Sequence, residues 1–159
     1  MIAVRNYRED DEASVVAVIR DLQRHEGQYF DRLKPAEEVG PWYVGVLQKE
    51  LALARGVLLV AEFDGRVVGY ASLFLDQASD SSKEEIPYSY SCVGDLGVLH
   101  DCRGRGVGTA LMDRCEQLAR DHGAKWLRLG VLAGNESARR FYRGRGLREL
   151  FVTLENTLS

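Results

Sequence analysis

The sequence predicts a single α+β domain, residues 1–159, built around a mixed β-sheet. Two β-like runs, Val57–Phe63 and Val67–Leu75, flank Asp64-Gly65, a dipeptide that suits a tight hairpin turn. The apolar run Cys92–Leu99 then leads through a glycine-rich turn into an amphipathic helix. After that helix, strand, helix and strand patterns follow one another to the end of the chain. This order of elements predicts one layered domain.

The amino-terminal part predicts a short strand followed by two helices. The strand is expected over Ile2–Arg5, and the negative charge of Asp10–Glu12 marks where the first helix begins. The apolar face of this helix consists of Val15, Val16, Ile19 and Leu22. After a break at Gly27–Pro35, the second helix is expected over Trp42–Arg55 and ends at Gly56.

The carboxy-terminal part continues the sheet beyond the hairpin. The polar stretch Gln77–Glu85 predicts a surface loop, and Ile86–Leu99 predicts a longer strand with a bulge or a close approach at Gly94 and Gly97. The helix after the glycine-rich turn runs to about His122 and stops at Gly123. A strand, a helix that starts near Asn135 or the preceding glycine, and a final strand are expected over Trp126–Leu132, Glu136–Arg143 and Leu147–Leu154.

Composition narrows the class of protein. Hydrophobic residues make up 45% of the 159 residues and charged residues 28%, which is typical of a soluble globular domain. Three cysteines without CxxC spacing predict neither a disulfide framework nor a metal site, and they favour a cytoplasmic location. We expect no membrane span and no signal peptide. The net charge of −3 argues against general binding of nucleic acid.

The glycine-rich turn is the strongest chemical signal. Gly104, Gly106 and Gly108 lie between a strand and a helix, where backbone N–H groups without helical partners point toward one place. The absence of Cβ atoms lets a bulky anion approach the main chain, and the helix dipole favours negative charge there. Arg103 and Arg105 add possible charge-assisted hydrogen bonds. The turn therefore predicts a pyrophosphate site.

Two nucleotide-binding designs agree poorly with this turn. A P-loop requires a lysine after its last glycine, and none follows here. A Rossmann site requires G-x-G-x-x-G near the start of a βαβ unit and an acidic residue about 20 positions later. The spacing here is G-x-G-x-G, and the next strand carries Arg128. A nicotinamide-dependent protein remains a distant alternative.

A third design matches at two places. Arg103-x-x-Gly106-x-Gly108 resembles the Q/R-x-x-G-x-G/A coenzyme A signature of the GNAT superfamily of N-acetyltransferases. Asn135-x-x-Ala138-x-x-Phe141-Tyr142 is similar to its second signature, N-x-x-A-x-x-F/L-Y, and Gly144–Leu147 resembles the usual tail. Asp95–Val98 looks like the end of that family's fourth strand. The resemblance implies a mixed, mostly antiparallel sheet flanked by helices and splayed between its fourth and fifth strands.

The resemblance also implies how acetyl-CoA binds. Its pantetheine arm is expected to lie between the two splayed strands, hydrogen-bonded by the main chain of Leu96 and Val98 on either side of Gly97. Asn135 would contact the arm from the other side. The pyrophosphate would be held at the turn by Arg103 and by the amides of Gly104, Arg105, Gly106, Val107, Gly108 and Thr109. No metal is implied.

The catalytic residues are only partly assigned. Tyr142 matches the family's usual general acid, near the thioester sulfur. The positions where many relatives carry a glutamate correspond to Gly94 and Gly130, which cannot accept a proton. Asp95 is the nearest acid, as a base or amine-binding carboxylate, but strand alternation directs it to the other face unless a bulge turns it, and a structural role competes. A water chain is an equal contender, and weaker candidates are Asp76, Glu62 and His100.

The expected activity is transfer of the acetyl group from acetyl-CoA to a primary amine by direct attack, with the oxyanion held by a backbone N–H of the fourth strand. The alternative is a non-catalytic acyl-CoA-binding regulatory module. An aromatic and acidic rim suits a cationic amine, although its members are equally well explained as ordinary loop residues: Tyr29, Phe30, Asp31, Glu37 and Glu38. The apolar run Leu150–Leu154 either completes the sheet or pairs with a second subunit, which leaves a homodimer open.

Overall fold

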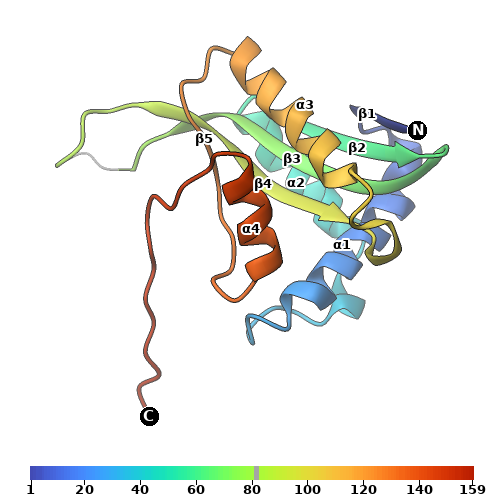
Figure 1. The fold of residues 1–159 in the computed structure, drawn as a ribbon, viewed down its shortest axis with the longest axis horizontal. Helices are drawn as coiled ribbons and strands as arrows, with labels where there is room; N and C mark the ends of the chain where they lie inside the picture. The colour runs from blue at the N-terminus through green and yellow to red at the C-terminus, as the bar shows by residue number, and fades with distance from the viewer. Residues whose placement is uncertain (81–82) are drawn as a thin grey trace.

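The computed structural model describes residues 1–80 and 83–159. Its described residues form one five-stranded sheet in the order β1-β2-β3-β4-β5 (Figure 1). The first three pairings are antiparallel and the pairing of β4 with β5 is parallel. This confirms the predicted mixed, mostly antiparallel sheet. The strands are β1 (Ile2–Asn6), β2 (Val57–Phe63), β3 (Arg66–Ala78), β4 (Ser89–Val98) and β5 (Leu127–Leu129).

Helices cover both faces of the sheet (Figure 1). Strand alternation along β2 divides the core, because Leu58 and Val60 pack with the first two helices whereas Leu59 and Ala61 pack with the third. Among the described residues the α-helices are α1 (Glu12–Glu26), α2 (Pro41–Leu53), α3 (Val107–Asp121) and α4 (Glu136–Gly144). Short 3₁₀ turns lie at Glu9–Asp11, Ala36–Glu38 and His100–Cys102. None of the helices in the described residues has the length and hydropathy needed to span a bilayer.

The hairpin between β2 and β3 forms where the sequence predicts it. Asp64 and Gly65 both adopt positive φ values, 50° and 79°, as a two-residue hairpin turn of this hand requires. Strand β3 continues past the predicted end, since Gln77 and Ala78 pair with Tyr90 and Ser89. The predicted loop Gln77–Glu85 is therefore shorter than expected, and its residues 81–82 lie outside the described residues.

A β-bulge interrupts β4. Leu73 pairs with Val93 but Ala71 pairs with Leu96, so two residues of β4, Gly94 and Asp95, lie opposite one residue of β3. A Cβ atom at Gly94 would lie 2.6 Å from the Phe74 ring and 2.8 Å from the Ser72 hydroxyl oxygen, so only glycine is accommodated here. The bulge predicted at Gly94 is confirmed.

The predicted last strand, Leu147–Leu154, is wrong. Residues 148–159 make no backbone hydrogen bond to the described part of the chain and extend away from the domain (Figure 1). The Phe151 side chain is 72% exposed and that of Leu154 is 89% exposed. A strand-like sequence forms a strand only where a partner strand accepts its hydrogen bonds, and the segment runs past the edge of β5 without pairing.

Candidate active site

The glycine-rich turn joins β4 to α3. Gly104 and Gly106 have φ values of 71° and 89°, in the left-handed region that side chains disfavour. Gly106 is the N-cap residue of α3, and no side chain caps this helix. The amides of Val107, Gly108 and Thr109 have no hydrogen-bond partner among the described residues. The turn therefore presents unpaired donors at the positive end of a 15-residue helix.

The two arginines of the turn are engaged with the protein. Arg103 donates from Nε to the carbonyl oxygen of Val98 at 3.0 Å and lies 3.5 Å from the carboxylate of Asp21. The Arg105 guanidinium lies 5.8 Å from the centroid of the Phe63 ring. Arg103 thus fastens the turn to the last residue of β4, which fixes where the unpaired amides point.

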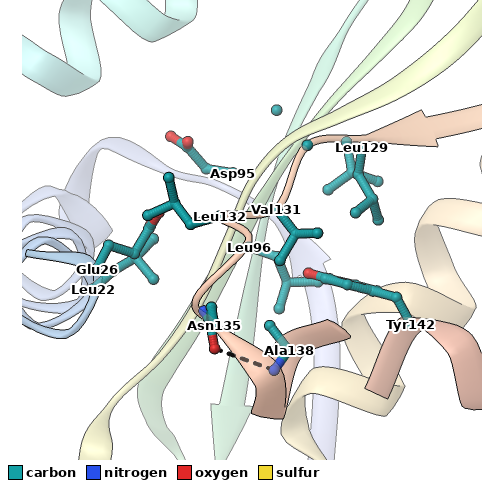
Figure 2. A pocket seen from close by; sticks show the side chains of 13 residues that line it. Leu22, Glu26, Asp95, Leu96, Leu129, Val131, Leu132, Asn135, Ala138 and Tyr142 are labelled. Atoms are coloured by element: carbon teal, nitrogen blue, oxygen red, sulfur yellow. Dashed lines mark hydrogen bonds between the residues drawn. The ribbon is translucent and has the colours of Figure 1, made fainter. Parts of the chain in front are cut away.

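A pocket opens where β4 and β5 separate (Figure 2). The parallel pairing covers only three residues of each strand and ends at Val93 and Leu129. Beyond that point the pocket is lined from β4 by Gly94, Asp95 and Leu96, and from the other side by the chain that follows β5. Helices α1 and α4 complete the walls. The two strands splay apart as the resemblance implies, and Leu96 lies where β4 is no longer paired with β5.

Tyr142 enters this pocket from α4 (Figure 2). Burial raises the pKa of its phenol to about 12, and the charge of Glu26 adds to the shift. The ring also packs edge-on against Phe141, with centroids 5.2 Å apart. The phenol is therefore a neutral hydrogen-bond donor at physiological pH.

Asp95 reaches the pocket through the bulge of β4. Its backbone N–H donates to the Ser72 hydroxyl oxygen at 2.8 Å, and its Oδ2 accepts a hydrogen bond from the Tyr43 hydroxyl at 2.9 Å. Burial raises the pKa of this carboxyl, and the hydrogen bond from Tyr43 opposes that shift. Strand alternation alone would direct Asp95 to the other face of the sheet. The bulge adds one residue to β4 and so turns this side chain, as the sequence argument required.

Glu26 is a pocket residue that the sequence did not single out. It is the last residue of α1 and lies four positions after Leu22, which also lines the pocket. Residues at i and i+4 share a helix face, and that spacing was the available signal. In Figure 2, Glu26 lies on α1 and the ring of Tyr142 enters from α4, while the carboxylate of Asp95 points away from Tyr142. Burial and the nearby Asp95 charge raise the pKa of the Glu26 carboxyl.

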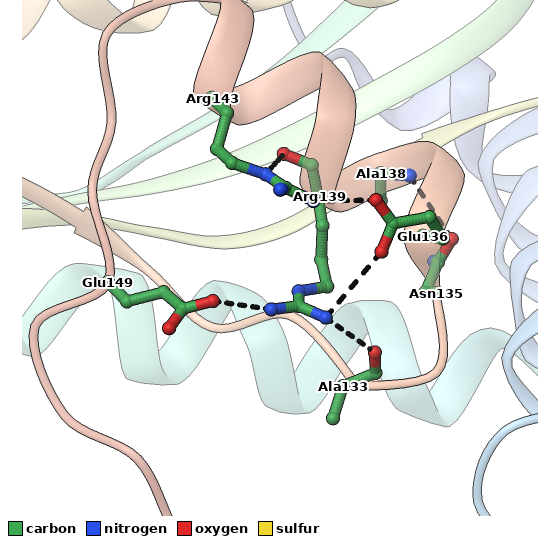
Figure 3. Close-up of polar contacts among 7 residues, drawn as sticks. All are labelled: Ala133, Asn135, Glu136, Ala138, Arg139, Arg143 and Glu149. Carbon is green, nitrogen blue, oxygen red and sulfur yellow. Dashed lines mark hydrogen bonds and ion pairs between the residues drawn. The ribbon is translucent and has the colours of Figure 1, made fainter.

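Asn135 lines the pocket and also begins α4. Its Oδ1 accepts a hydrogen bond from the Ala138 amide at 3.2 Å, as an N-cap residue does. The helix is fastened further by Arg139, which bonds to the carbonyl of Ala133 and pairs with Glu136 and Glu149 (Figure 3). These contacts fix the orientation of α4 and hence the position of Tyr142.

The other positions considered for the general base either lie outside the pocket or have no acidic side chain. Gly130 lines the pocket, and nothing lies within 4 Å of where its Cβ would stand. Glu62 pairs with Arg5, and Asp76 lies 3.8 Å from the imidazole of His122. The described residues contain no group of three or more His, Cys, Asp or Glu side chains that could hold a metal ion.

A model of the acetyltransferase (GNAT) family matches residues 16–147. The chain belongs to this family. The GNAT chain is 27% identical over 146 residues to an uncharacterised N-acetyltransferase of Methanocaldococcus jannaschii, covering 92% of this chain and 60% of that protein. It is 27% identical over 158 residues to a thialysine N-epsilon-acetyltransferase of Bos taurus, covering 94% and 85%. The matches span 60%, 59% and 55% of the length of three curated relatives, the Methanocaldococcus jannaschii protein being the first of them.

Solved structures agree with the GNAT fold. A tetramutant of a Bacillus halodurans protein superposes with a TM-score of 0.86 at 19% identity, covering 98% of this chain and 99% of the other. A ribosomal-protein-alanine N-acetyltransferase of Brucella melitensis biovar Abortus 2308 superposes with a TM-score of 0.69 at 19% identity, covering 100% of both chains. The predicted family and fold are confirmed, and family membership supports acetyl transfer in general.

Proposed function

We propose that this GNAT chain is an acetyl-CoA-dependent N-acetyltransferase that acts on a primary amine. One observation carries the proposal: the opening between β4 and β5 has unpaired helix amides near one end and is lined by both Tyr142 and Asp95. Acyl transfer from the thioester of coenzyme A uses three kinds of group. Hydrogen-bond donors hold the diphosphate, a phenol stabilises the leaving thiolate, and a carboxylate binds the amine.

The cosubstrate side of the site consists mostly of main chain. The amides of residues 104–109 hold the pyrophosphate of acetyl-CoA, because they are unpaired and the left-handed glycines leave room beside them. The pantetheine arm runs along Leu96–Val98, where β4 has no strand partner on the β5 side, and Asn135 contacts it from the opposite wall. A Cβ at Gly108 would lie 3.9 Å from the Leu96 side chain, so the turn and this part of β4 are adjacent.

The reaction is a direct attack. The amine nitrogen forms a bond to the thioester carbonyl carbon, and a backbone N–H in Leu96–Val98 donates to the oxygen as it becomes negative. The carbon–sulfur bond breaks, and Tyr142 donates a hydrogen bond to the departing thiolate, which solvent later protonates. Asp95 accepts the proton that the amine loses. A carboxylate whose pKa is raised by burial is a better proton acceptor than an exposed one.

The test is a thiol-release assay over a panel of primary amines, with mass spectrometry of the products. We expect acetyl-CoA to bind and at least one amine to gain about 42 Da, because an acetyl group replaces one hydrogen of the amine. Tight binding of acetyl-CoA with no turnover on any amine would instead identify a non-catalytic acyl-CoA-binding module.

We also propose a cytoplasmic homodimer. The cytoplasmic location is supported by Cys92, Cys102 and Cys115, which are all free thiols. The dimer is supported by residues 148–159, whose backbone has no partner within residues 1–80 and 83–159 and whose apolar side chains are exposed. It is also supported by β5, which pairs on one edge only among the described strands. A second copy can accept such a segment at the free edge of its sheet.

A further inference from the structure

The acceptor side of the pocket contains two carboxylates from different elements. Asp95 comes from the bulge of β4, and Glu26 comes from the end of α1. Both line the same opening between β4 and β5 (Figure 2). Burial raises the pKa of the Glu26 carboxyl, and the charge of Asp95 on the other side of the opening adds to that shift.

Neither carboxylate has a cationic partner among the described residues. Asp95 accepts its hydrogen bond from the neutral Tyr43 hydroxyl, and Glu26 makes no side-chain hydrogen bond or ion pair with the described part of the chain. The chain contains 21 lysines and arginines, and other partly buried acids use them. Asp11 pairs with Arg5 at 2.7 Å, and Asp21 lies 3.5 Å from Arg103.

The negative charge of these two carboxylates contributes to the raised pKa values of the tyrosines around the pocket. The Tyr70 hydroxyl is fully buried, and burial together with the charge of Asp95 raises the pKa of this phenol. The charge of Glu26 raises the pKa of Tyr142 and of Tyr43. Two half-buried carboxylates without a counter-charge are costly, so such a pair is expected where a ligand supplies the positive charge.

We propose that Glu26 is an acceptor-binding residue and that the acceptor is a dication, an amine that carries a second positively charged group. Asp95 pairs with the reacting ammonium, which releases one proton to solvent before it attacks and the second to Asp95 as the amide forms, while Glu26 pairs with the second cationic group. This inference rests on the proposed acetyl transfer. It identifies a substrate class, short diamines and related dications, that an amine-binding site with a single carboxylate would not favour.

The experiment compares 1,4-diaminobutane with n-butylamine, which have the same carbon chain but differ by one charge. The shift in Tm on adding each amine is measured first, because it reports binding without turnover, and kcat/KM is measured second. The variants are Glu26→Gln and, as a matched control, Glu12→Gln at the exposed start of the same helix. Calorimetry with acetyl-CoA verifies that each variant retains a folded cosubstrate site.

We expect the wild type to be stabilised by the diamine and to prefer it at least about tenfold in kcat/KM, the effect of one hydrogen bond to a charged group. Glu26→Gln should lose the stabilisation and most of the preference, while Glu12→Gln keeps both. Equal binding of the two amines, or a preference that survives in Glu26→Gln, overturns the inference and leaves acetyl transfer standing. Diamine binding that depends on Glu26 without any turnover would support the dication site and refute the proposed activity.

Discussion

Replacement of Tyr142 by phenylalanine tests the proposed chemistry most directly. The substitution removes one hydroxyl from the pocket and keeps the ring, which packs against Phe141. We expect kcat to fall by at least about tenfold with little change in the affinity for acetyl-CoA, because the hydroxyl acts on charge that develops only as the thiolate departs.

The size of this effect follows from the environment of the phenol. With a pKa of about 12, the phenol is a weaker acid than a thiol of pKa about 8.5, so full proton transfer to the thiolate is uphill by about 5 kcal/mol. Tyr142 is therefore expected to act by hydrogen bonding. A hydrogen bond to a charged group contributes about 1.5–3 kcal/mol, which corresponds to roughly a ten- to hundredfold change in rate.

The assay is steady-state thiol release with a saturating amine, combined with calorimetry for acetyl-CoA. Tyr90→Phe is the matched control, since Tyr90 lies on β4 outside the pocket. Because the pKa of Tyr142 is about 12, kcat of the wild type should also show no loss of the phenol proton between about pH 8 and 10. Wild-type turnover in Tyr142→Phe would remove this residue from the mechanism, and a fall in affinity alone would assign it to binding.

Three further predictions concern the turn, the acidic pair and the last residues. Gly106→Ala should lower the free energy of unfolding by about 1–2 kcal/mol and weaken acetyl-CoA binding. Gly123→Ala is the control, because Gly123 has a φ of 88° at the other end of α3, and it should lower stability alone. Equal affinities for acetyl-CoA in the two variants would contradict the role of the turn. Glu26→Gln should raise Tm at pH 7, because a raised pKa means that the ionised carboxyl destabilises the fold. This gain should disappear as the pH falls below the ordinary pKa of glutamate, about 4.3, and a gain that persists at pH 3.5 in thermal unfolding would refute the assignment. A chain ending at Arg148 should sediment as a monomer where the full chain sediments as a dimer, and an unchanged mass would refute the exchange of the last residues.

Local signals in the sequence predicted most of the fold. The Asp64-Gly65 turn needs only two left-handed residues, and the glycine turn before α3 needs only positions where a Cβ is disfavoured. The capping role of Asn135 is equally local, since it bonds to the amide three residues later. Such features depend on neighbours along the chain and can be recognised without knowing the packing.

The acceptor side of the pocket could not be predicted in the same way. Glu26 and Asp95 are far apart in the sequence, and they line one pocket because α1 packs on β4 and because a one-residue bulge lets Asp95 accept a hydrogen bond from Tyr43 of α2. The sequence assigned Asp95 to the site only if a bulge turned its side chain. The register of β3 with β4 shows that bulge, and the register is known only from the folded sheet.

The sequence by itself determined the family, the order of elements and the anion-binding turn, since each depends on residue spacing that survives without tertiary contacts. The tertiary structure decided which acids share the pocket, how far the pKa of Tyr142 rises and whether Leu147–Leu154 forms a strand. These are properties of burial and of partners distant in the chain. A carboxylate acquires its pKa, and a strand its hydrogen bonds, from the groups that folding brings beside it.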